Sequence, residues 1–505
     1  MENYKKKEIN KSFEKIIRKY GHLKASEKDK KTITDRLEYL KKNGKFSDVT
    51  SDDPNEAKTK LQWIDFVQQG GGTLGISLVG YTFVLEYVGI RFLRLAGTSA
   101  GAINTLFLAA IGEKDDPKTP ELFDMMDDVS RFNMKSFIDT KNKLIRQMIF
   151  KGKGLIMNFL GISLVLLLLV LFPLPVIGYI GVEGKVVYVI FMIIFIVWIG
   201  YIYYLLTSFG KNNFGISPGN AFESFLEKEL RDFGVENQKN LDDKAKLCFK
   251  FKVEGDHAIG IEIIDGQTKN NRSIILKLDL KNNKFDEAYQ WLKVDYSFVT
   301  TDMYNECKIV LPREANLYFE NSSTQNPAQY VRASMAIPFF FKPKIFKTYK
   351  EKVKDNYLWE SWKGINIQRV KTYGVCIDGG SLSNFPINLF HNSKIEVPRV
   401  PIFGARIVDE KPINREERIM SFGSFLKKII NTLRSNEDNS FLAINPFYKK
   451  YCIAEIKTYD TQVSWLNFDL TQKQKDALFI EGVEEALCFL EKFDWENYKL
   501  ERKKV

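Results

Sequence analysis

A chain of 505 residues is longer than one ordinary domain of roughly 100 to 200 residues, so it folds as several units or as one large domain with insertions. With 45% hydrophobic and 27% charged residues, the composition excludes a largely disordered chain. The formal net charge of +11 fits either a nucleic acid or an anionic membrane surface, and charge alone does not choose between them.

The five cysteines are odd in number and far apart, and none stands in a CxxC or other metal-ligand spacing. We therefore expect reduced thiols and no metal site. The first residues, with lysines at positions 5 to 7, lack the apolar stretch of a signal peptide. This predicts that most of the chain lies in the cytoplasm.

Residues 1–58 are rich in lysine, with apolar residues at irregular helical spacing. This pattern predicts one or two charged helices. They could form an electrostatic arm for a membrane or partner, or a solvated helical cap on the folded core. A run of charges is more often a solvated face, so the cap is the favoured interpretation.

Residues 59–140 alternate between short apolar runs and helical patterns. Strands are predicted at 63–68 and 91–96, and helices at 74–87 and 100–111. A βαβα order indicates a parallel sheet covered by helices. Ligands of such sheets bind in the loops that follow the strands.

Residues 141–211 contain two long stretches without charge, each long enough to cross the hydrocarbon core of a bilayer. We predict an inserted transmembrane hairpin with spans at about 154–174 and 186–207. A buried hairpin in a globular domain is the alternative, but neither stretch offers a polar face. Basic flanks on both sides predict a multi-pass protein with two spans and its catalytic domain on the cytoplasmic side.

After the hairpin, strand-like runs resume, which indicates that residues 212–410 form the second part of the same α/β core. Residues 411–505 are predicted to be a C-terminal α/β region that closes the core, with an amphipathic helix at 471–493. The predicted strands are 258–264, 273–278, 296–301, 307–311, 374–377, 401–407 and 451–456.

The run Gly97-Thr98-Ser99-Ala100-Gly101 stands between a predicted strand and a predicted helix. A Gly-x-Ser-x-Gly run in that context is typical of a strained turn that exposes a nucleophilic hydroxyl. The N-terminus of the following helix would face the negative charge that develops in acyl transfer. Ser99 is therefore the candidate nucleophile.

A second glycine cluster, Gly70-Gly71-Gly72, follows the first strand and opens the next helix. Consecutive glycines let backbone N–H groups converge on an anion, as an oxyanion hole requires. The same run also matches the GxGxxG pattern of dinucleotide-binding sites. The acidic residue expected near the end of the second strand is absent, which disfavours that alternative.

Asp378 ends a predicted strand and is followed by Gly379 and Gly380, so its carboxylate would lie in an open turn. A carboxylate within hydrogen-bond reach of Ser99 could take its proton directly. The alternative is a Ser-His-Asp triad, for which His391 is the candidate among three histidines.

The motifs GGGTLG, GTSAG, RASMAIPFFF and DGG occur in this order, and together they resemble the patatin-like phospholipase family. The likeness covers residues 61–140 and 212–410. It implies a three-layer α/β/α sandwich with a mostly parallel central sheet, interrupted here by the hairpin. It also implies a Ser99–Asp378 dyad, an oxyanion hole from the three glycines, and cleavage of fatty-acyl esters of the phospholipase A type without metal or cofactor.

Two positions depart from the family pattern. Gln69 stands where an Asp is common, and Leu74 stands where an Arg or Lys is common. Loss of the cation could weaken oxyanion stabilisation, so a catalytically silent lipid-binding or scaffolding protein is a second hypothesis. The expected partners are membrane phospholipids or other acyl lipids and the bilayer itself, with no nucleic acid.

Overall fold

Two compact units are present in the computed structural model. The first comprises Met1–Asn133, Glu223–Ala336 and Lys344–Val505, and the second comprises Met134–Phe222 and Ile337–Pro343. The structure describes residues 13–24, 31–54, 59–140, 153–171, 179, 181–211, 215–245, 248–254, 256–264, 267–268, 275–279, 291–293, 295–348, 358–393, 395–411 and 422–504.

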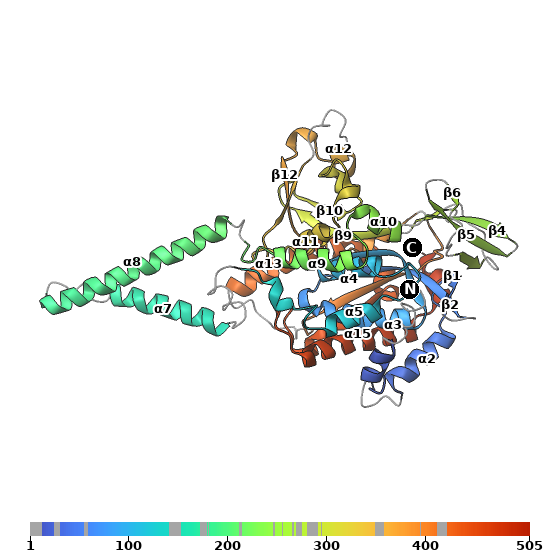
Figure 1. The fold of residues 1–505 in the computed structure, drawn as a ribbon, viewed down its shortest axis with the longest axis horizontal. Helices are drawn as coiled ribbons and strands as arrows, with labels where there is room; N and C mark the ends of the chain where they lie inside the picture. Colours follow the sequence, from blue (N-terminus) through green and yellow to red (C-terminus); the bar gives the residue numbers. More distant parts are fainter. Residues whose placement is uncertain are drawn as a thin grey trace. The chain divides into compact units, whose positions relative to one another are not determined.

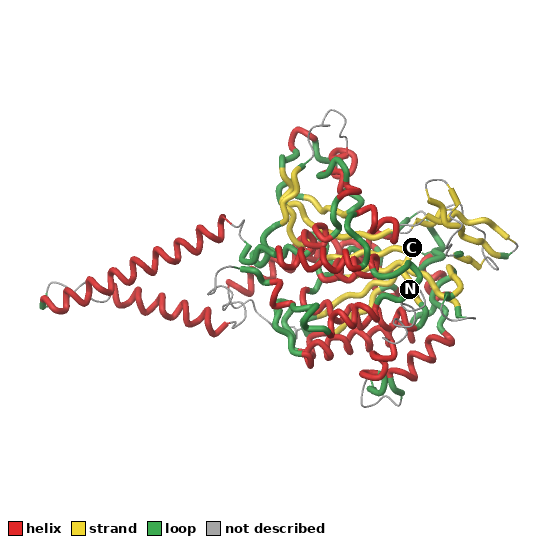
Figure 2. The backbone as a smooth tube through the Cα atoms, in the orientation of Figure 1, coloured by secondary structure: helices red, strands yellow, loops and turns green. Residues whose placement is uncertain are grey.

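A mixed β-sheet forms the centre of the first unit (Figure 2). Its parallel part runs in the order β14, β13, β2, β3, β9. The bounds of these strands are Ile453–Lys457, Ile402–Val408, Lys60–Gln68, Ile90–Thr98 and Asp295–Asp302.

Antiparallel strands extend the sheet on both sides. Beyond β9 lie β10 (Cys307–Leu311), β12 (Tyr373–Asp378) and β11 (Lys344–Lys347). Beyond β2 lie β1 (Val49–Asp52), β7 (Leu276–Asp279), β5 (His257–Ile264), β4 (Cys248–Glu254), β8 (Trp291–Lys293) and β6 (Gln267–Thr268).

The expectation of a mostly parallel sheet is therefore wrong outside the five central strands. Neighbouring strands such as β9 and β10, or β4 and β5, follow one another after only a few residues. So short a connection joins antiparallel strands, whereas a parallel pair needs a crossover of a dozen or more residues.

The βαβα order predicted for residues 59–140 is confirmed. Strand β2 leads through the short 3-10 helix η1 (Gly72–Gly75) into α3 (Ile76–Tyr87), and β3 leads into α4 (Ala100–Ala110). Both strands are almost wholly buried, as continuous apolar runs in parallel sheets usually are.

Helices cover both faces of this sheet. In Figure 1, α3, α5 and α15 lie together. Asn104 of α4 donates to Thr82 of α3, and Phe107 of α4 contacts Phe225 of α9, so these helices share one face of the sheet. On the other face, α14 and α16 pack against Val67 and Ala96. Helices α3 and α15 approach closely at Gly80 and Gly482, where an added Cβ would collide with the facing backbone. The further helices of this unit are α2 (Ile33–Asn43), α5 (Thr119–Asp127), α9 (Asn220–Asp232, whose first residues belong to the second unit), α10 (Gln238–Ala245), α11 (Ala328–Ser334), α12 (Leu358–Lys363), α13 (Phe422–Ile444), α14 (Pro446–Tyr451), α15 (Gln472–Lys492) and α16 (Trp495–Arg502).

The N-terminal region packs on the core. Helical residues 13–20 bring Lys19 and Tyr20 to Asp476 of α15, at 3.0 and 2.7 Å. Arg36 of α2 forms two bonds of 2.7 Å to Glu491 of the same helix. The region also adds strand β1, which helical spacing does not predict.

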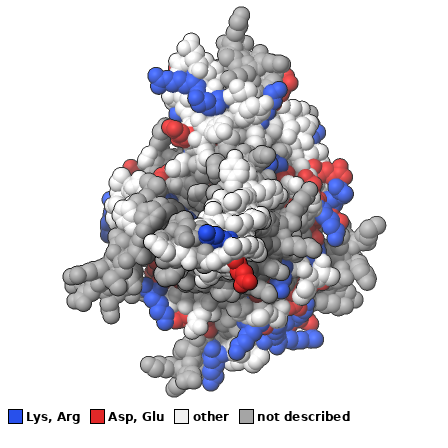
Figure 3. Space-filling view, turned by 90° about the vertical axis from the view of Figure 1, so that its left-hand side faces the viewer, with Lys and Arg blue, Asp and Glu red and all other residues white. Residues whose placement is uncertain are grey.

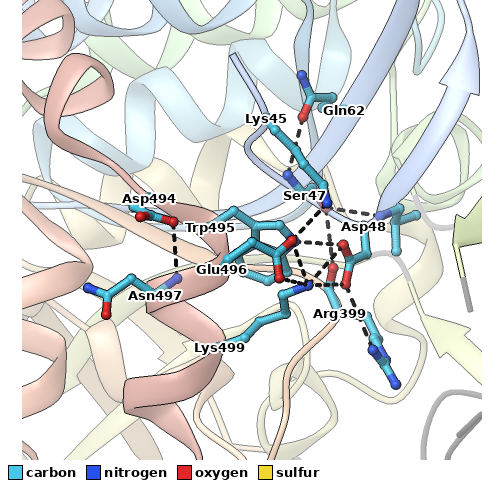
Figure 4. Close-up of polar contacts among 11 residues, drawn as sticks. Lys45, Ser47, Asp48, Gln62, Arg399, Asp494, Trp495, Glu496, Asn497 and Lys499 are labelled. Atoms are coloured by element: carbon cyan, nitrogen blue, oxygen red, sulfur yellow. Dashed lines mark hydrogen bonds and ion pairs between the residues drawn. The ribbon is translucent and has the colours of Figure 1, made fainter. Parts of the chain in front are cut away.

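A buried ionic cluster joins the start of the sheet to the last helix (Figure 4). The Asp48 carboxylate accepts from Trp495 Nε1 at 2.7 Å and from Lys499 Nζ at 3.1 Å. Arg399 lies 3.8 Å from the same carboxylate. Because Asp48 is only 5% exposed, loss of one of these partners would leave a buried charge uncompensated.

The second unit contains two long apolar helices, α7 (Lys153–Leu171) and α8 (Val182–Lys211), which run side by side in opposite directions. Trp198 Nε1 donates to Ser163 Oγ at 3.0 Å, and the Tyr188 hydroxyl donates to the Val170 carbonyl at 3.3 Å.

One helix among the described residues, Val182–Tyr204, is long and apolar enough to cross a membrane. It overlaps the second predicted span. The first predicted span falls on α7 and continues into residues 172–174, outside the described residues. The transmembrane hairpin is therefore not confirmed, and the basic flank at 141–152 also lies outside the described residues.

Candidate active site

Ser99 occupies a strained turn between β3 and α4. Its backbone has φ 53° and ψ −117°, a conformation that residues other than glycine rarely adopt. Gly97 and Gly101 permit this turn, because a Cβ at either position would collide with neighbouring backbone. Strain held in this way is common at functional sites.

Among the described residues, three side chains lie next to Ser99. Its N–H donates to Ser334 Oγ at 2.9 Å, and its hydroxyl lies 3.1 Å from Met335 Sδ. The hydroxyl also acts to lower the pKa of Asp378, whose carboxyl lies next to it. Ser334 in turn donates to the Val299 carbonyl at 2.6 Å, so its hydroxyl is fully engaged in holding the turn.

Asp378 is the last residue of β12 and is 6% exposed. Its Oδ1 accepts from the Gly380 N–H at 2.6 Å. Burial raises the pKa of Asp378 above its ordinary value, while Arg434, Ser99 and Gly380 act in the opposite direction. A raised pKa makes the carboxylate a stronger base for a hydroxyl proton.

The glycine loop lies against the serine turn. A Cβ built on Gly70 would stand 3.0 Å from Ser99 Cβ and 2.5 Å from Asn384 Oδ1. The Gly70 N–H donates to the Asn384 carbonyl at 3.0 Å. Within the described part of the chain, the N–H groups of Gly71 and Gly72 donate to no protein atom.

The two departures from the family pattern have structural roles. Gln69 Oε1 accepts from the Ile407 N–H at 2.6 Å, and the Gln69 N–H donates to the Ala405 carbonyl at 3.0 Å. The glycine loop is thereby fixed to β13. Leu74 is 1% exposed and belongs to the core.

Sequence patterns did not indicate the contribution of α13. Arg434 Nη2 donates to Asn384 Oδ1 at 2.8 Å. One helical turn later, Asp438 accepts from Ser383 Oγ at 2.8 Å and from the Phe385 N–H at 2.7 Å. Burial raises the pKa of Asp438 to about 6. Helix α13 thus forms hydrogen bonds with the segment that follows the Asp-Gly-Gly motif. No local sequence motif predicts the α13 residues that do so.

His391 has other partners. Its Nδ1 lies 2.8 Å from the Tyr448 hydroxyl, and its ring packs edge-on against Phe441. Burial and Arg502 lower the pKa of His391. Within the described part of the chain, Ser99 lies beside Ser334, Met335 and Asp378, and none of these contacts supports the triad alternative.

A buried serine on a strand-to-helix turn, next to a buried carboxyl group and a glycine loop, defines an α/β protein with a site of hydrolase type. The family model for patatin-like phospholipases matches residues 66–391, about two thirds of the sequence. The chain belongs to the patatin-like phospholipase family, and this membership supports a lipid acyl hydrolase.

Two further comparisons were found. YqhO, an uncharacterized protein of Bacillus subtilis (strain 168), is 22% identical over 433 residues, which cover 86% of this chain and 100% of YqhO. The crystal structure of VipD from Legionella pneumophila is 16% identical with a TM-score of 0.33, and the match covers 89% of this chain and 71% of VipD.

Proposed function

We propose that this chain is a membrane-anchored serine lipid acyl hydrolase of the phospholipase A type, with Ser99 as nucleophile and Asp378 as base. The observation that carries the proposal is the strained, buried turn of Ser99 next to the buried carboxyl of Asp378, whose pKa the Ser99 hydroxyl acts to lower. A serine is a weak nucleophile until a base removes its proton, and an adjacent carboxylate meets that need.

The reaction would proceed in two steps. Ser99 Oγ attacks the ester carbonyl while Asp378 accepts its proton. Asp378 then returns the proton to the departing alcohol oxygen as the ester bond breaks, leaving a fatty-acyl serine. In the second step a water molecule gives a proton to Asp378 and attacks the acyl carbon, and the proton returns to Ser99 as the fatty acid leaves.

Two N–H groups would receive the oxyanion. Those of Gly71 and Gly72 have no acceptor in the described part of the chain, whereas the Gly70 N–H already donates to Asn384. We assign Gly70 to the oxyanion loop as the residue that brings it against Ser99. The N-terminus of α4 adds positive potential at the same place.

The membrane anchor remains part of the proposal. Large apolar side chains of α8 are exposed to solvent, with Val186, Ile193 and Val197 at 54%, 56% and 66%. So much exposed apolar surface is rare on a protein that contacts only water. Figure 3 shows one face of the molecule, on which the basic side chains of the described residues lie among acidic and uncharged ones.

We further propose the domain division that accompanies this anchor. A two-span hairpin at 141–211 would interrupt the catalytic core of 59–140 and 212–410, with 1–58 and 411–505 as flanking regions. The catalytic core would lie on the cytoplasmic side and meet its phospholipid substrate at the membrane surface.

A fluorophosphonate probe tests the catalytic assignment, because it reacts covalently with an activated serine. The proposal predicts labelling of the full chain in detergent, with labelling lost in Ser99→Ala and strongly slowed in Asp378→Asn. His391→Ala should label like the wild type. Labelling that persists in Ser99→Ala, or that depends on His391, would contradict the dyad.

A further inference from the structure

Arg434 lies beside the active site, although its helix, α13, carries none of the sequence motifs of the core. Its Nη2 donates to Asn384 Oδ1 at 2.8 Å, and its guanidinium carbon lies 5.8 Å from the ring centre of Trp465. Its Nε is buried and has no hydrogen-bond acceptor in the described part of the chain. A buried N–H without an acceptor destabilises the folded state. We therefore expect the Arg434 side chain to have a role that offsets this cost.

The two residues that Arg434 contacts hold the two ends of the glycine loop. Asn384 accepts the Gly70 N–H through its carbonyl at 3.0 Å and donates from Nδ2 to the Gly70 carbonyl at 3.1 Å. The Trp465 carbonyl accepts the Thr73 N–H at 2.9 Å. The unoccupied N–H groups of Gly71 and Gly72 lie between these two anchors.

Arg434 also faces the base. A Cβ built on Gly380 would lie 2.8 Å from Asp378 Oδ1 and 3.2 Å from Arg434 Nε, so both groups border the same face of that glycine. The guanidinium acts to lower the pKa of Asp378 against the effect of burial. Among the described residues, the other groups that contact Asp378 are uncharged: Ser99 before α4, Gly380 in the 3-10 helix η8 (Gly379–Ser381), Thr300 opposite it on β9, and the carbonyl of Ala336 after α11.

We propose that Arg434 is a positioning residue, which holds the glycine loop in its oxyanion-binding shape through Asn384 and Trp465 and supplies the positive charge that faces the Asp378 carboxylate. The inference rests on the proposed Ser99–Asp378 hydrolysis. During attack, negative charge moves from Asp378 to the oxyanion. The guanidinium lies beside the Asp378 carboxylate and holds the glycine loop through Asn384 and Trp465. A fixed cation of this kind needs no rearrangement as the charge moves.

The test compares four variants of the full chain in detergent: Arg434→Gln, Arg434→Lys, Asn384→Ala and the control Lys428→Gln. Lys428 is an exposed basic residue on the same helix. The readout is the pH profile of kcat/KM with p-nitrophenyl butyrate, a soluble ester, together with the melting temperature of each variant.

Arg434→Gln should lower kcat/KM at neutral pH by about tenfold or more and move the acidic limb up by about one pH unit, because an adjacent cation favours the ionised carboxylate. Arg434→Lys should restore the position of the acidic limb but only part of the rate. Asn384→Ala should lower the rate with the limb in place, since the charge remains. Lys428→Gln should change neither.

An unshifted acidic limb in a folded Arg434→Gln, or no recovery in Arg434→Lys, would overturn the role of Arg434 and leave the dyad intact. If Arg434→Gln does not fold, the position of the acidic limb and the rate are compared in Arg434→Lys (the lysine variant) and the Asn384→Ala variant instead. Wild-type turnover that persists in Ser99→Ala would instead contradict the proposed function, and the inference with it.

Discussion

The backbone N–H of Ser99 donates to the hydroxyl of Ser334, 2.9 Å away on the last residue of α11. A serine at the end of one helix thereby holds the turn from which another helix starts. Because the Ser334 hydroxyl donates its hydrogen bond to the Val299 carbonyl, it can act on Ser99 only as an acceptor. Its role is to fix the geometry of the turn.

Ser334→Ala removes that acceptor and leaves a buried N–H without a partner, at a cost of about 1–3 kcal/mol. We expect a lower melting temperature and a loss of about tenfold in kcat/KM, because the turn is no longer fixed. Ser361→Ala, on the exposed face of α12, should change neither value. Wild-type stability in Ser334→Ala would show that the hydrogen bond is dispensable.

Asp378→Asn should abolish turnover, and it should also change how stability depends on pH. Burial raises the native pKa of Asp378, so the native state binds this proton more tightly than the unfolded state does. Stability is then lost as the pH rises from the ordinary Asp value near 4 through the native pKa. The asparagine variant lacks this loss, so its melting temperature should gain on that of the wild type between pH 4 and pH 7.

The matched control for this pH effect is Asp243→Asn, an exposed carboxyl on α10. Its melting temperature should follow that of the wild type at every pH. If the difference between Asp378→Asn and the wild type stays constant over the range, the carboxyl does not titrate as its burial requires.

Asp48→Asn tests the cluster that joins β1 to α16. Removing one partner of a buried ion pair leaves a buried charge uncompensated, which costs about 3 kcal/mol or more. We expect a clear fall in melting temperature with kcat/KM at low temperature unchanged. Asp52→Asn is the control, because the Asp52 side chain is 73% exposed and its pair with Lys277 contributes little. Equal stability of the two variants would contradict the structural role of the cluster.

The anchor predicts a change in fractionation. A double variant of α8, Ile194→Lys with Val197→Lys, places two charges near the middle of the proposed span, at about 3 kcal/mol each. The protein should then move from the carbonate-resistant membrane fraction toward the soluble fraction. Val129→Lys, at an exposed position of the first unit, should stay with the membrane. Membrane retention of the double variant would argue against α8 as a span.

Sequence reasoning succeeded where the signal was local. The alternation of β2, α3, β3 and α4 follows from apolar runs broken by glycines, and the structure brings Ser99, the glycine loop and Asp378 together as their motifs predicted. Their catalytic roles stay predictions.

The missed features depend on contacts between distant segments. Ser334 lies 235 residues from the N–H that it accepts, and Arg434 lies 50 residues from Asn384. No spacing rule reports such pairs. The antiparallel flanks were missed for a similar reason, since a short apolar run looks the same whichever way its neighbour runs.

The central claim is that Ser99 cleaves membrane lipids. Lipid mass spectrometry of phospholipid vesicles incubated with purified wild type, Ser99→Ala or Asp378→Asn tests it most directly. Wild type should release free fatty acid and the matching lysophospholipid in equal amounts, and both variants should release neither. Intact phospholipid after incubation with the wild type, or equal product from Ser99→Ala, would contradict the account.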